Sequence, residues 1–122
     1  MKHVMIIDDS RIMRNIVKNI FATLKIPCNY LEAGDGTEAL KLLGAEKVDL
    51  ILLDWNMPNL SGIEFLKKVK AMDRYKEIPV IMVTSEAAKL NVVEAIKSGV
   101  TAYITKPINE RVFLEKISKI NF

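Results

Sequence analysis

The sequence predicts an α/β domain built on a five-stranded parallel sheet with helices on both faces. Short apolar runs alternate with longer amphipathic stretches, three of the runs are apolar without interruption, and no linker or repeat divides the 122 residues. Uninterrupted apolar runs are typical of strands covered on both faces, as in parallel sheets. Strands that alternate with helices indicate right-handed crossover units. The length corresponds to one domain, which we expect to span residues 1–122.

Five short apolar runs are the predicted strands. They lie at 3–7, 28–31, 50–53, 80–83 and 102–104. The second run contains Asn29 and is more polar than the others, which predicts an edge strand.

The helices are predicted from apolar residues at a spacing of three or four. The first helix carries its apolar stripe at Ile12, Met13, Ile16, Val17, Ile20, Phe21 and Leu24. The second is expected over about 37–43, with Gly44 as its stop. Ser61 and Glu64 form a capping-box pattern that opens the third helix.

The last two helices have clear end signals. The fourth is expected over about 87–98, where Gly99 follows as a natural C-terminal stop. The fifth is expected over about 109–120, with Asn109 as its N-cap.

Composition and charge exclude several classes of protein. Half of the residues are hydrophobic and 27% are charged, which is typical of globular domains. A single cysteine, Cys28, allows no internal disulfide and suits a reducing compartment. No apolar run approaches the roughly 18 residues of a membrane span, so we expect a cytoplasmic protein. The net charge of +3 is spread over isolated lysines. Only Lys67, Lys68 and Lys70 cluster, and we expect a solvated helix face there rather than a nucleic-acid site.

Chemically useful side chains follow four of the predicted strands. Asp8 and Asp9 follow the first, Asp54 the third, Thr84 the fourth and Lys106 the fifth. Ligands of open parallel sheets bind beyond the carboxyl ends of the strands. The sequence therefore predicts one cleft that contains three carboxylates, a hydroxyl and an ammonium group.

Such a cluster favours phosphoryl chemistry with a metal ion. Carboxylates held together repel one another, and a hard divalent cation such as Mg²⁺ or Mn²⁺ relieves that cost. Asp8 and Asp9 are the natural metal ligands, and the central Asp54 is the best nucleophile. Lys106 and Thr84 would neutralise and hold a phosphoryl group. The plain alternative is that such residues cap the next helix, as Asp9 or Ser10 could.

Zinc is not expected in this chain. His3 and Cys28 fall in different predicted strands and have no partner ligands near them in the sequence. We expect His3 to be an ordinary strand residue and Cys28 to be a small hydrophobic residue that is either buried or at the sheet edge.

Four short motifs carry a resemblance to a known family. They are IIDDS at 6–10, DWNMPN at 54–59 followed by Gly62, MVTSE at 82–86 and KP at 106–107. In this order they make the chain similar to the receiver domains of two-component response regulators, and most of all to the single-domain chemotaxis CheY proteins. The resemblance covers about residues 2–120. It implies a flavodoxin-like, doubly wound sheet with the strand order 2-1-3-4-5 that flavodoxin and CheY share. The family commonly has Phe where this chain has Ile108.

The resemblance implies a role for each carboxylate. Asp54 would be the phosphoacceptor, and a histidine kinase would be the phosphoryl donor. Asp9 would bind Mg²⁺ directly, and Asp8 mainly through water. The main-chain carbonyl of Asn56 would complete the metal site, in which Mn²⁺ can replace Mg²⁺. Glu86 and Asn59 flank this site.

The resemblance also implies how the signal leaves the site. Lys106 would pair with phosphate or with Asp54, and the bond before Pro107 would be cis. Thr84 would move to the phosphoryl group, and Tyr103 would swing between an outer and an inner rotamer. Without the resemblance, Tyr103 is an ordinary half-buried strand aromatic.

The output surface implied by the resemblance is formed by the fourth helix, the fifth strand and the fifth helix. The expected contact residues are Lys89, Val92, Tyr103 and Lys116, whose plain alternative is exposed surface. The chain ends at Phe122, just after the fifth helix, so we expect the output to be docking of this surface onto another protein. The target would be a flagellar motor switch protein that controls flagellar rotation. We expect a monomeric phosphoprotein that assists its own phosphorylation and dephosphorylation rather than an enzyme.

Three alternatives remain open at this point. The first is a phosphorelay intermediate that passes phosphate to a histidine phosphotransferase. The second is an aspartate-nucleophile phosphatase, which needs a second Asp where this chain has Asn56. The third is a flavin or nucleotide module, although the glycines form no loop that could cradle phosphate.

Overall fold

Five strands and five helices alternate along the chain in the computed structural model, which describes residues 1–122. The strands are β1 (Lys2–Ile7), β2 (Cys28–Ala33), β3 (Leu50–Leu53), β4 (Val80–Thr84) and β5 (Ala102–Thr105). The helices are α1 (Arg11–Thr23), α2 (Gly36–Ala45), α3 (Gly62–Lys70), α4 (Lys89–Lys97) and α5 (Glu110–Ser118). Every element predicted from the sequence is present. None of the helices has the length and apolar character that a membrane crossing requires.

The sheet is parallel throughout, with the strand order β2-β1-β3-β4-β5. Ile7 of β1 pairs with Ala33 of β2 and with Leu53 of β3. Leu53 pairs in turn with Met82 of β4, and Met82 with Tyr103 of β5. The predicted strand order is confirmed, and β2 is the predicted edge strand. Because the strand ends are aligned, the residues that follow them meet at one edge of the sheet.

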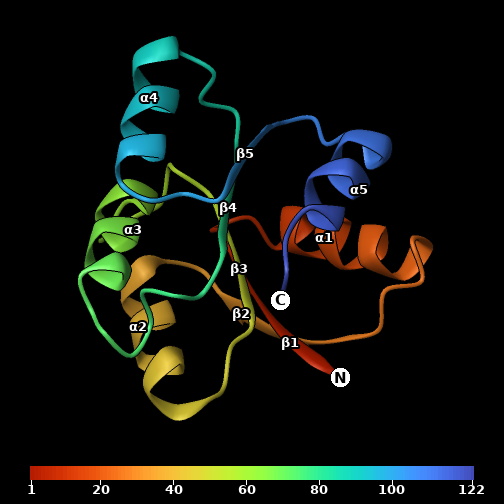
Figure 1. Ribbon diagram of the computed structural model, residues 1–122, viewed down its shortest axis with the longest axis horizontal. Coiled ribbons are helices and arrows are strands. Elements are labelled where there is room, and N and C mark those ends of the chain that lie inside the picture. Colours follow the sequence, from red (N-terminus) through yellow and green to blue (C-terminus); the bar gives the residue numbers. More distant parts are fainter.

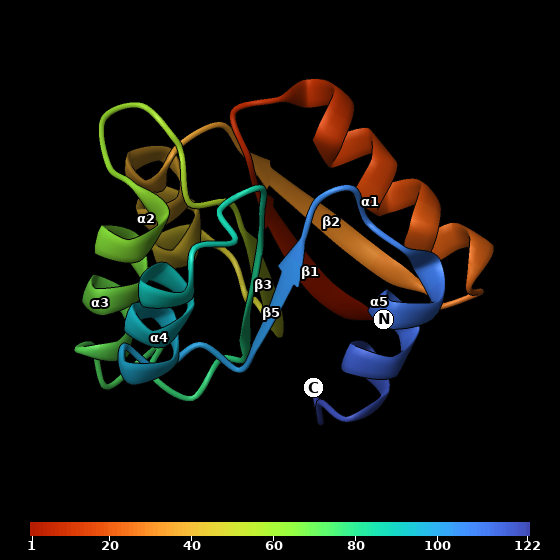
Figure 2. The same cartoon turned by 90° about the horizontal axis from the view of Figure 1, so that it is seen from above.

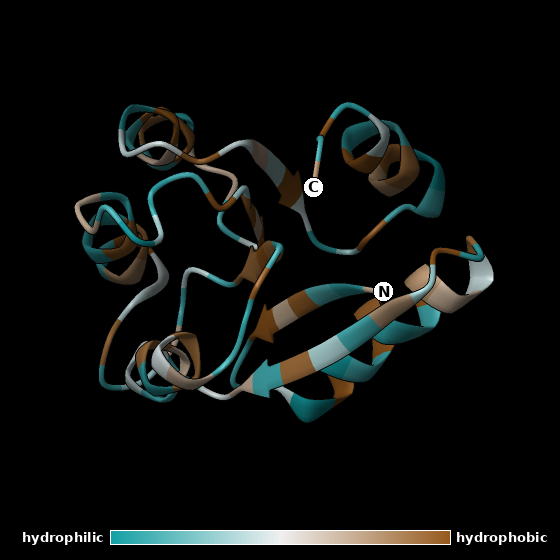
Figure 3. Cartoon of the chain, turned by 60° about the horizontal axis from the view of Figure 1, so that its bottom comes forward, coloured by the Kyte–Doolittle hydropathy of each residue, from teal (hydrophilic) through white to brown (hydrophobic).

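The sheet separates two layers of helices. Helices α2, α3 and α4 cover one face, and α1 and α5 cover the other (Figures 1 and 2). Met5 and Ile7 belong to a cluster of 15 buried residues, and Val4 and Ile6 to a second cluster of 13. Successive strand residues point to opposite faces, so a strand covered on both faces is apolar throughout. Hydropathy colouring accordingly shows brown segments on the strands (Figure 3).

Side-chain caps open four of the five helices. Ser10, Asp35, Ser61 and Asn109 each accept a hydrogen bond from a main-chain N–H in the first turn. The predicted capping box at Ser61 and the predicted cap at Asn109 are confirmed, and Ser10 rather than Asp9 caps α1. After α4, Gly99 adopts a φ of +102°, the left-handed conformation expected of a C-terminal stop.

Three predicted helix ends differ from the structure. Gly44 does not stop α2, which continues to Ala45, and the main-chain N–H of Glu46 still donates to the carbonyl of Leu42. The chain leaves this helix in an extended conformation at Glu46, so no left-handed residue is needed. Helix α4 begins at Lys89 rather than at about 87, and its N-cap residue, Ala88, makes no side-chain hydrogen bond. Helix α5 ends at Ser118 rather than at about 120.

Burial corrects two further expectations. Ile12 and Ile16 are 73% and 39% exposed, because they lie outside the α1 arc that buries Val17. The lysine cluster is not uniformly solvated. Lys67 and Lys68 are exposed, whereas the partly buried Lys70 donates to two carbonyls in the segment before β4. Burial lowers the pKa of Lys70.

His3 and Cys28 behave as expected. His3 is a residue of β1, and its main-chain N–H donates to the Asp49 carboxylate. Cys28 is a buried residue of β2 with 8% of its surface exposed, and burial raises the pKa of its thiol.

Candidate functional site

Three carboxylates meet at the carboxyl ends of β1 and β3. Asp8 and Asp54 follow neighbouring strands, and the main-chain N–H of Asp54 donates to the carbonyl of Ile7 at 2.9 Å. One carboxylate oxygen from each of Asp8, Asp9 and Asp54 lies within 4.8 Å of the other two. Asp8 and Asp54 are each 6% exposed, whereas Asp9 is open to solvent. The sheet thus brings the three predicted carboxylates together, in a group that could hold a metal ion.

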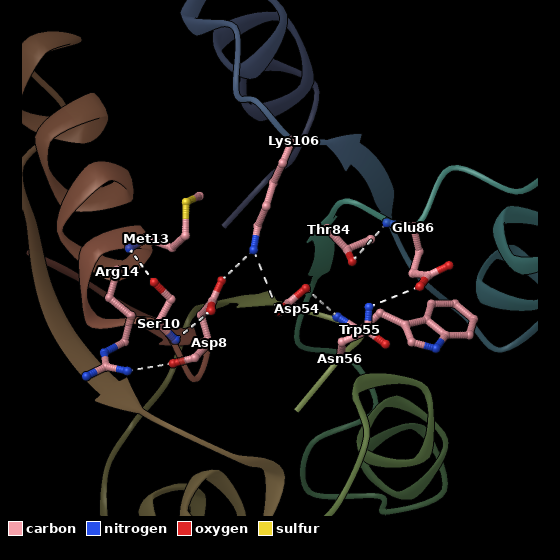
Figure 4. Close-up of polar contacts among 10 residues, drawn as sticks. All are labelled: Asp8, Ser10, Met13, Arg14, Asp54, Trp55, Asn56, Thr84, Glu86 and Lys106. Carbon is pink, nitrogen blue, oxygen red and sulfur yellow. Dashed lines mark hydrogen bonds and ion pairs between the residues drawn. The ribbon is translucent and has the colours of Figure 1, made fainter. Parts of the chain in front are cut away.

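Lys106 reaches this cluster from the end of β5 (Figure 4). Its Nζ lies 2.9 Å from Oδ2 of Asp8 and 3.6 Å from Oδ2 of Asp54. The contact with Asp54 agrees with the sequence-based expectation, and the shorter contact with Asp8 was not foreseen. The peptide bond between Lys106 and Pro107 is cis, as the resemblance implies.

The surroundings of Asp54 disfavour its charged form. Burial raises its pKa most, and the negative charge of Asp8 raises it further. The Lys106 ammonium acts in the opposite direction, as does the main-chain N–H of Trp55, which donates to Oδ1 of Asp54 at 2.8 Å. The pKa of Asp54 is raised on balance. A bound divalent cation would favour the charged carboxylates, so the donor set fits a hard metal ion.

The main chain at Asp8 is fixed from several sides. Its carboxylate accepts from the main-chain N–H of Ser10 at 2.9 Å, and its N–H donates to the carbonyl of Ala33 at 3.0 Å. Its carbonyl accepts a hydrogen bond from Nη1 of Arg14 at 2.5 Å. Sequence reasoning missed Arg14, because an arginine on an amphipathic helix carries no sign of the carbonyl that it will contact.

Asn56 lies beside the cluster, and its side chain points to the β4–α4 loop. Its amide nitrogen donates to Oε1 of Glu86 at 3.0 Å, and Asn91 of α4 donates to Oε2 of Glu86 at 3.0 Å. Asn56 also lines an open cleft together with Asp9 and Trp55. Its main-chain carbonyl remains the predicted fourth metal ligand.

Thr84 and Tyr103 connect the cluster to β4 and β5. Thr84 is fully buried, and its hydroxyl accepts from the main-chain N–H of Glu86 at 3.3 Å. This hydroxyl also lies near enough to Asp54 to lower the pKa of that carboxyl. The half-buried Tyr103 donates its hydroxyl hydrogen bond to the main-chain carbonyl of Glu86. Glu86 therefore contacts Asn56 and Asn91 through its carboxylate, and Thr84 and Tyr103 through its main chain.

The other predicted contact residues lie away from the carboxylates. Tyr103 and Lys116 line one groove between β5 and α5. Lys89 is the exposed first residue of α4, and Val92 is half-buried on the same helix. The fold thus places all four on the α4–β5–α5 part of the molecule.

Asn59 has a positive φ of 67°, and its side chain donates to the carboxylate of Asp35 at 2.8 Å. The segment that follows Asp54 is therefore tied to the N-cap of α2.

Comparison with known proteins gives one consistent family. Residues 4–118 match the model of the response regulator receiver domain. The chain is 44% identical to the chemotaxis protein CheY of Pseudomonas aeruginosa over 117 residues, which are 96% of this chain and 94% of that protein. It is 43% identical to the chemotaxis protein CheY1 of Helicobacter pylori, with 95% and 94% of the two chains covered.

Solved structures agree with the sequence relatives. The chemotaxis protein CheY4 of Vibrio cholerae superposes with a TM-score of 0.88 at 30% identity, over 99% of both chains. The Mn²⁺-bound form of the response regulator Rcp1 superposes with a TM-score of 0.83 at 26% identity, over 98% of this chain and 91% of that one.

Proposed function

The chain belongs to the family of response regulator receiver domains, and on that premise we propose that it is a phosphorylation-activated chemotaxis regulator of the CheY type. The names of its relatives support the chemotaxis assignment. Because the chain covers 94% of the Pseudomonas aeruginosa CheY protein, residues 1–122 are proposed to work as one receiver domain.

Asp54 is the proposed phosphoacceptor. The observation that carries this role is its place at the end of the central strand β3, where the Lys106 ammonium contacts both its carboxylate and that of Asp8. A carboxylate oxygen of Asp54 attacks the phosphorus of a phosphohistidine on the kinase. The new P–O bond forms as the P–N bond breaks, and the imidazole leaves. Lys106 and the Thr84 hydroxyl bind phosphoryl oxygens in this proposal, which lowers the cost of the developing charge; the nearness of both groups to Asp54 supports these roles.

The proposed metal ligands are the carboxylates of Asp8, Asp9 and Asp54 and the main-chain carbonyl of Asn56. Mg²⁺ or Mn²⁺ at this site would neutralise the phosphoryl charge. All-oxygen ligation suits either ion, and the Mn²⁺-bound structure of Rcp1 supports the choice.

The proposed output surface is the α4–β5–α5 region with Lys89, Val92, Tyr103 and Lys116. A phosphoryl group adds about −1.5 to −2 charges, so Thr84 and Lys106 gain most by closing on it. Thr84 is linked through Glu86 to Tyr103, which supports a shift in the population of Tyr103 rotamers. We propose that a chemotaxis histidine kinase supplies the phosphoryl group, and that a flagellar motor switch protein binds the active monomer in the cytoplasm.

Intact mass after treatment with acetyl phosphate and Mg²⁺ tests the acceptor. The wild type should gain one phosphoryl group and Asp54→Asn none. Asp73→Asn removes a 94% exposed carboxylate outside the site and should be labelled like the wild type. Equal labelling of Asp54→Asn and the wild type would overturn the assignment, as would an unlabelled wild type.

Binding to a motor-switch peptide tests the output. Beryllofluoride treatment should increase the affinity of the wild type but not that of Asp54→Asn. An unchanged affinity, combined with fast phosphoryl transfer to a histidine phosphotransferase, would favour the phosphorelay alternative.

A further inference from the structure

We propose that Arg14 is a positioning residue of the metal site, which holds the peptide between Asp8 and Asp9 in the orientation that brings the Asp9 carboxylate to the cation. The inference rests on the proposed function, because Arg14 would orient a ligand of the proposed metal site. It concerns a helix residue that contacts none of the three carboxylates directly.

Arg14 is fixed at both sides of its guanidinium group, and Figure 4 shows its contact with Asp8. Nη1 donates to the main-chain carbonyl of Asp8 at 2.5 Å, and Nε donates to Oε1 of Glu32 at 3.0 Å. The second oxygen of Glu32 accepts from Nζ of Lys18 at 2.9 Å. The Arg14 side chain is only 17% exposed. A planar guanidinium with two fixed partners has little freedom to rotate, so it holds the carbonyl in one direction.

The orientation of this carbonyl limits where Asp9 can point. The peptide unit is planar, so fixing the Asp8 carbonyl also fixes the N–H and the Cα of Asp9, from which its side chain extends. The Asp9 carboxylate takes part in no hydrogen bond of the structure, whereas that of Asp8 contacts Ser10 and Lys106. Asp9 is thus directed mainly through its main chain, and Arg14 contacts the carbonyl that precedes it.

Charge alone would make an arginine here unfavourable for a cation site. Glu32 neutralises Arg14 through their ion pair of 3.0 Å. The pKa of Glu32 is lowered, most by its hydrogen bond from Lys18 and also by that from Arg14, so the carboxylate stays ionised near neutral pH. The Arg14–Glu32 pair taken alone is neutral, but Lys18 shares Glu32, so the three side chains together carry a net charge of +1.

The two effects of removing Arg14 on metal affinity have opposite signs. If only charge mattered, Arg14→Ala would remove a positive group and tighten Mg²⁺ binding. If Arg14 positions the peptide, the same change weakens Mg²⁺ affinity by about tenfold. Losses of this size are typical when a residue that hydrogen-bonds to a metal ligand is removed. The sign of the change distinguishes the two.

Mg²⁺ titration followed by tryptophan fluorescence measures this sign. Trp55 is the single tryptophan and lines the cleft with Asp9, so its emission reports on the site. We expect the Mg²⁺ Kd of Arg14→Ala to rise about tenfold over that of the wild type. Arg14→Lys keeps the charge but lacks the fork that reaches both partners, so its Kd should be intermediate. Arg11→Ala, the matched charge control on an exposed position of the same helix, should bind Mg²⁺ as well as the wild type or better.

The measured Mg²⁺ affinities can contradict either the role of Arg14 or the metal site itself. A Kd for Arg14→Ala equal to or below that of the wild type overturns the role of Arg14. If circular dichroism shows that Arg14→Ala does not fold, a Kd for Arg14→Lys equal to that of the wild type overturns it instead. A charge-neutral double variant, Arg14→Ala with Glu32→Ala, should bind more weakly than the wild type, and unchanged binding would contradict the inference. A wild type in which neither fluorescence nor calorimetry detects Mg²⁺ binding would refute the proposed metal site itself.

Discussion

Two loops on either side of Asp54 are held very differently. The β1–α1 loop is fixed by the Ser10 cap, by the contact of Ser10 with the Asp8 carboxylate and by the Arg14 hydrogen bond. The β4–α4 loop leads into a helix whose N-cap, Ala88, makes no side-chain hydrogen bond. The single fully buried residue of that helix is Ala95, whereas α1 buries three.

This difference suggests different roles: the β1–α1 loop keeps the carboxylates in place, and the β4–α4 segment changes conformation when the charge at Asp54 changes. The carboxylates need a constant geometry, and their loop is fixed from several sides. The β4–α4 segment has few buried contacts, which is typical of regions that open locally at low cost. Its main attachment is Glu86, whose carboxylate accepts from Asn56 and Asn91 at 3.0 Å each. We therefore expect conformational change on phosphorylation to concentrate at α4.

The largest change in the free energy of unfolding is expected at Gly62, which lies against the main chain of Asp54. A Cβ on Gly62 would lie 2.0 Å from the main-chain oxygen of Asp54, so Gly62→Ala should cost about 3 kcal/mol of unfolding free energy or more. Gly44→Ala is the control, because nothing lies within 4 Å of that position inside α2. It should gain about 0.5 to 1 kcal/mol. Urea denaturation measures both, and a small loss for Gly62→Ala would show that this segment is not rigid.

The second effect is a pH dependence of folding stability that arises from Asp54. It is measured in EDTA, so that no metal ion is bound. Its folded pKa is raised, so the folded state is destabilised while Asp54 is charged. Asp54→Asn should therefore be more stable than the wild type at pH 7. As the pH falls through the folded pKa towards the ordinary value of 3.8, the wild type takes up its proton and the difference should shrink. Thermal melts at several pH values measure this difference. An Asp54→Asn stability advantage that grows on acidification would contradict the sign.

The third effect tests the attachment of α4. Glu86→Ala removes two hydrogen bonds, so amide exchange in α4 should accelerate about tenfold while exchange in α1 stays unchanged. Glu94→Ala is the matched control on the same helix, because its ion pair with Lys67 is exposed and contributes little. Equal acceleration in both variants would show that Glu86 is not the main attachment.

The smallest effects come from the caps. Ser10→Ala should cost about 1 kcal/mol, because it removes the acceptor for the Met13 N–H. Ala88→Ser should instead gain about 0.5 kcal/mol by giving α4 the acceptor that it lacks. Chemical denaturation measures both changes. No gain from Ala88→Ser would mean that the missing cap does not explain the loose start of α4.

The fold could be predicted from the sequence because each element has a local signal. Central strands are apolar on both faces, and Ser61 and Asn109 mark helix starts within a few residues. The predicted end of α2 at Gly44 was wrong, because whether a glycine ends a helix depends on the path of the chain after it. No local sequence pattern encodes that path.

The site was predictable only in part. Topology alone brings Asp8 and Asp54 together, because they follow neighbouring strands. The bonds from Lys106 to Asp8 and from Arg14 to the Asp8 carbonyl join residues whose contact depends on side-chain rotamers. The same holds for the Glu86 contacts with Asn56 and Asn91. Such side-chain contacts produce no periodic pattern in the sequence, so they could not be predicted from it.

The pairing of Ile7 with Leu53 has a consequence for how this molecule can be altered. Asp8 and Asp54 stand on adjacent backbones whose separation, about 4.8 Å, is common to all sheets. Substitutions among the interior aliphatic residues therefore cannot tune the gap between these two acids. Inserting or deleting one residue in either strand would turn one of the acids to the opposite side of the sheet, so the proposed metal site would constrain the lengths of β1 and β3 as much as the fold does.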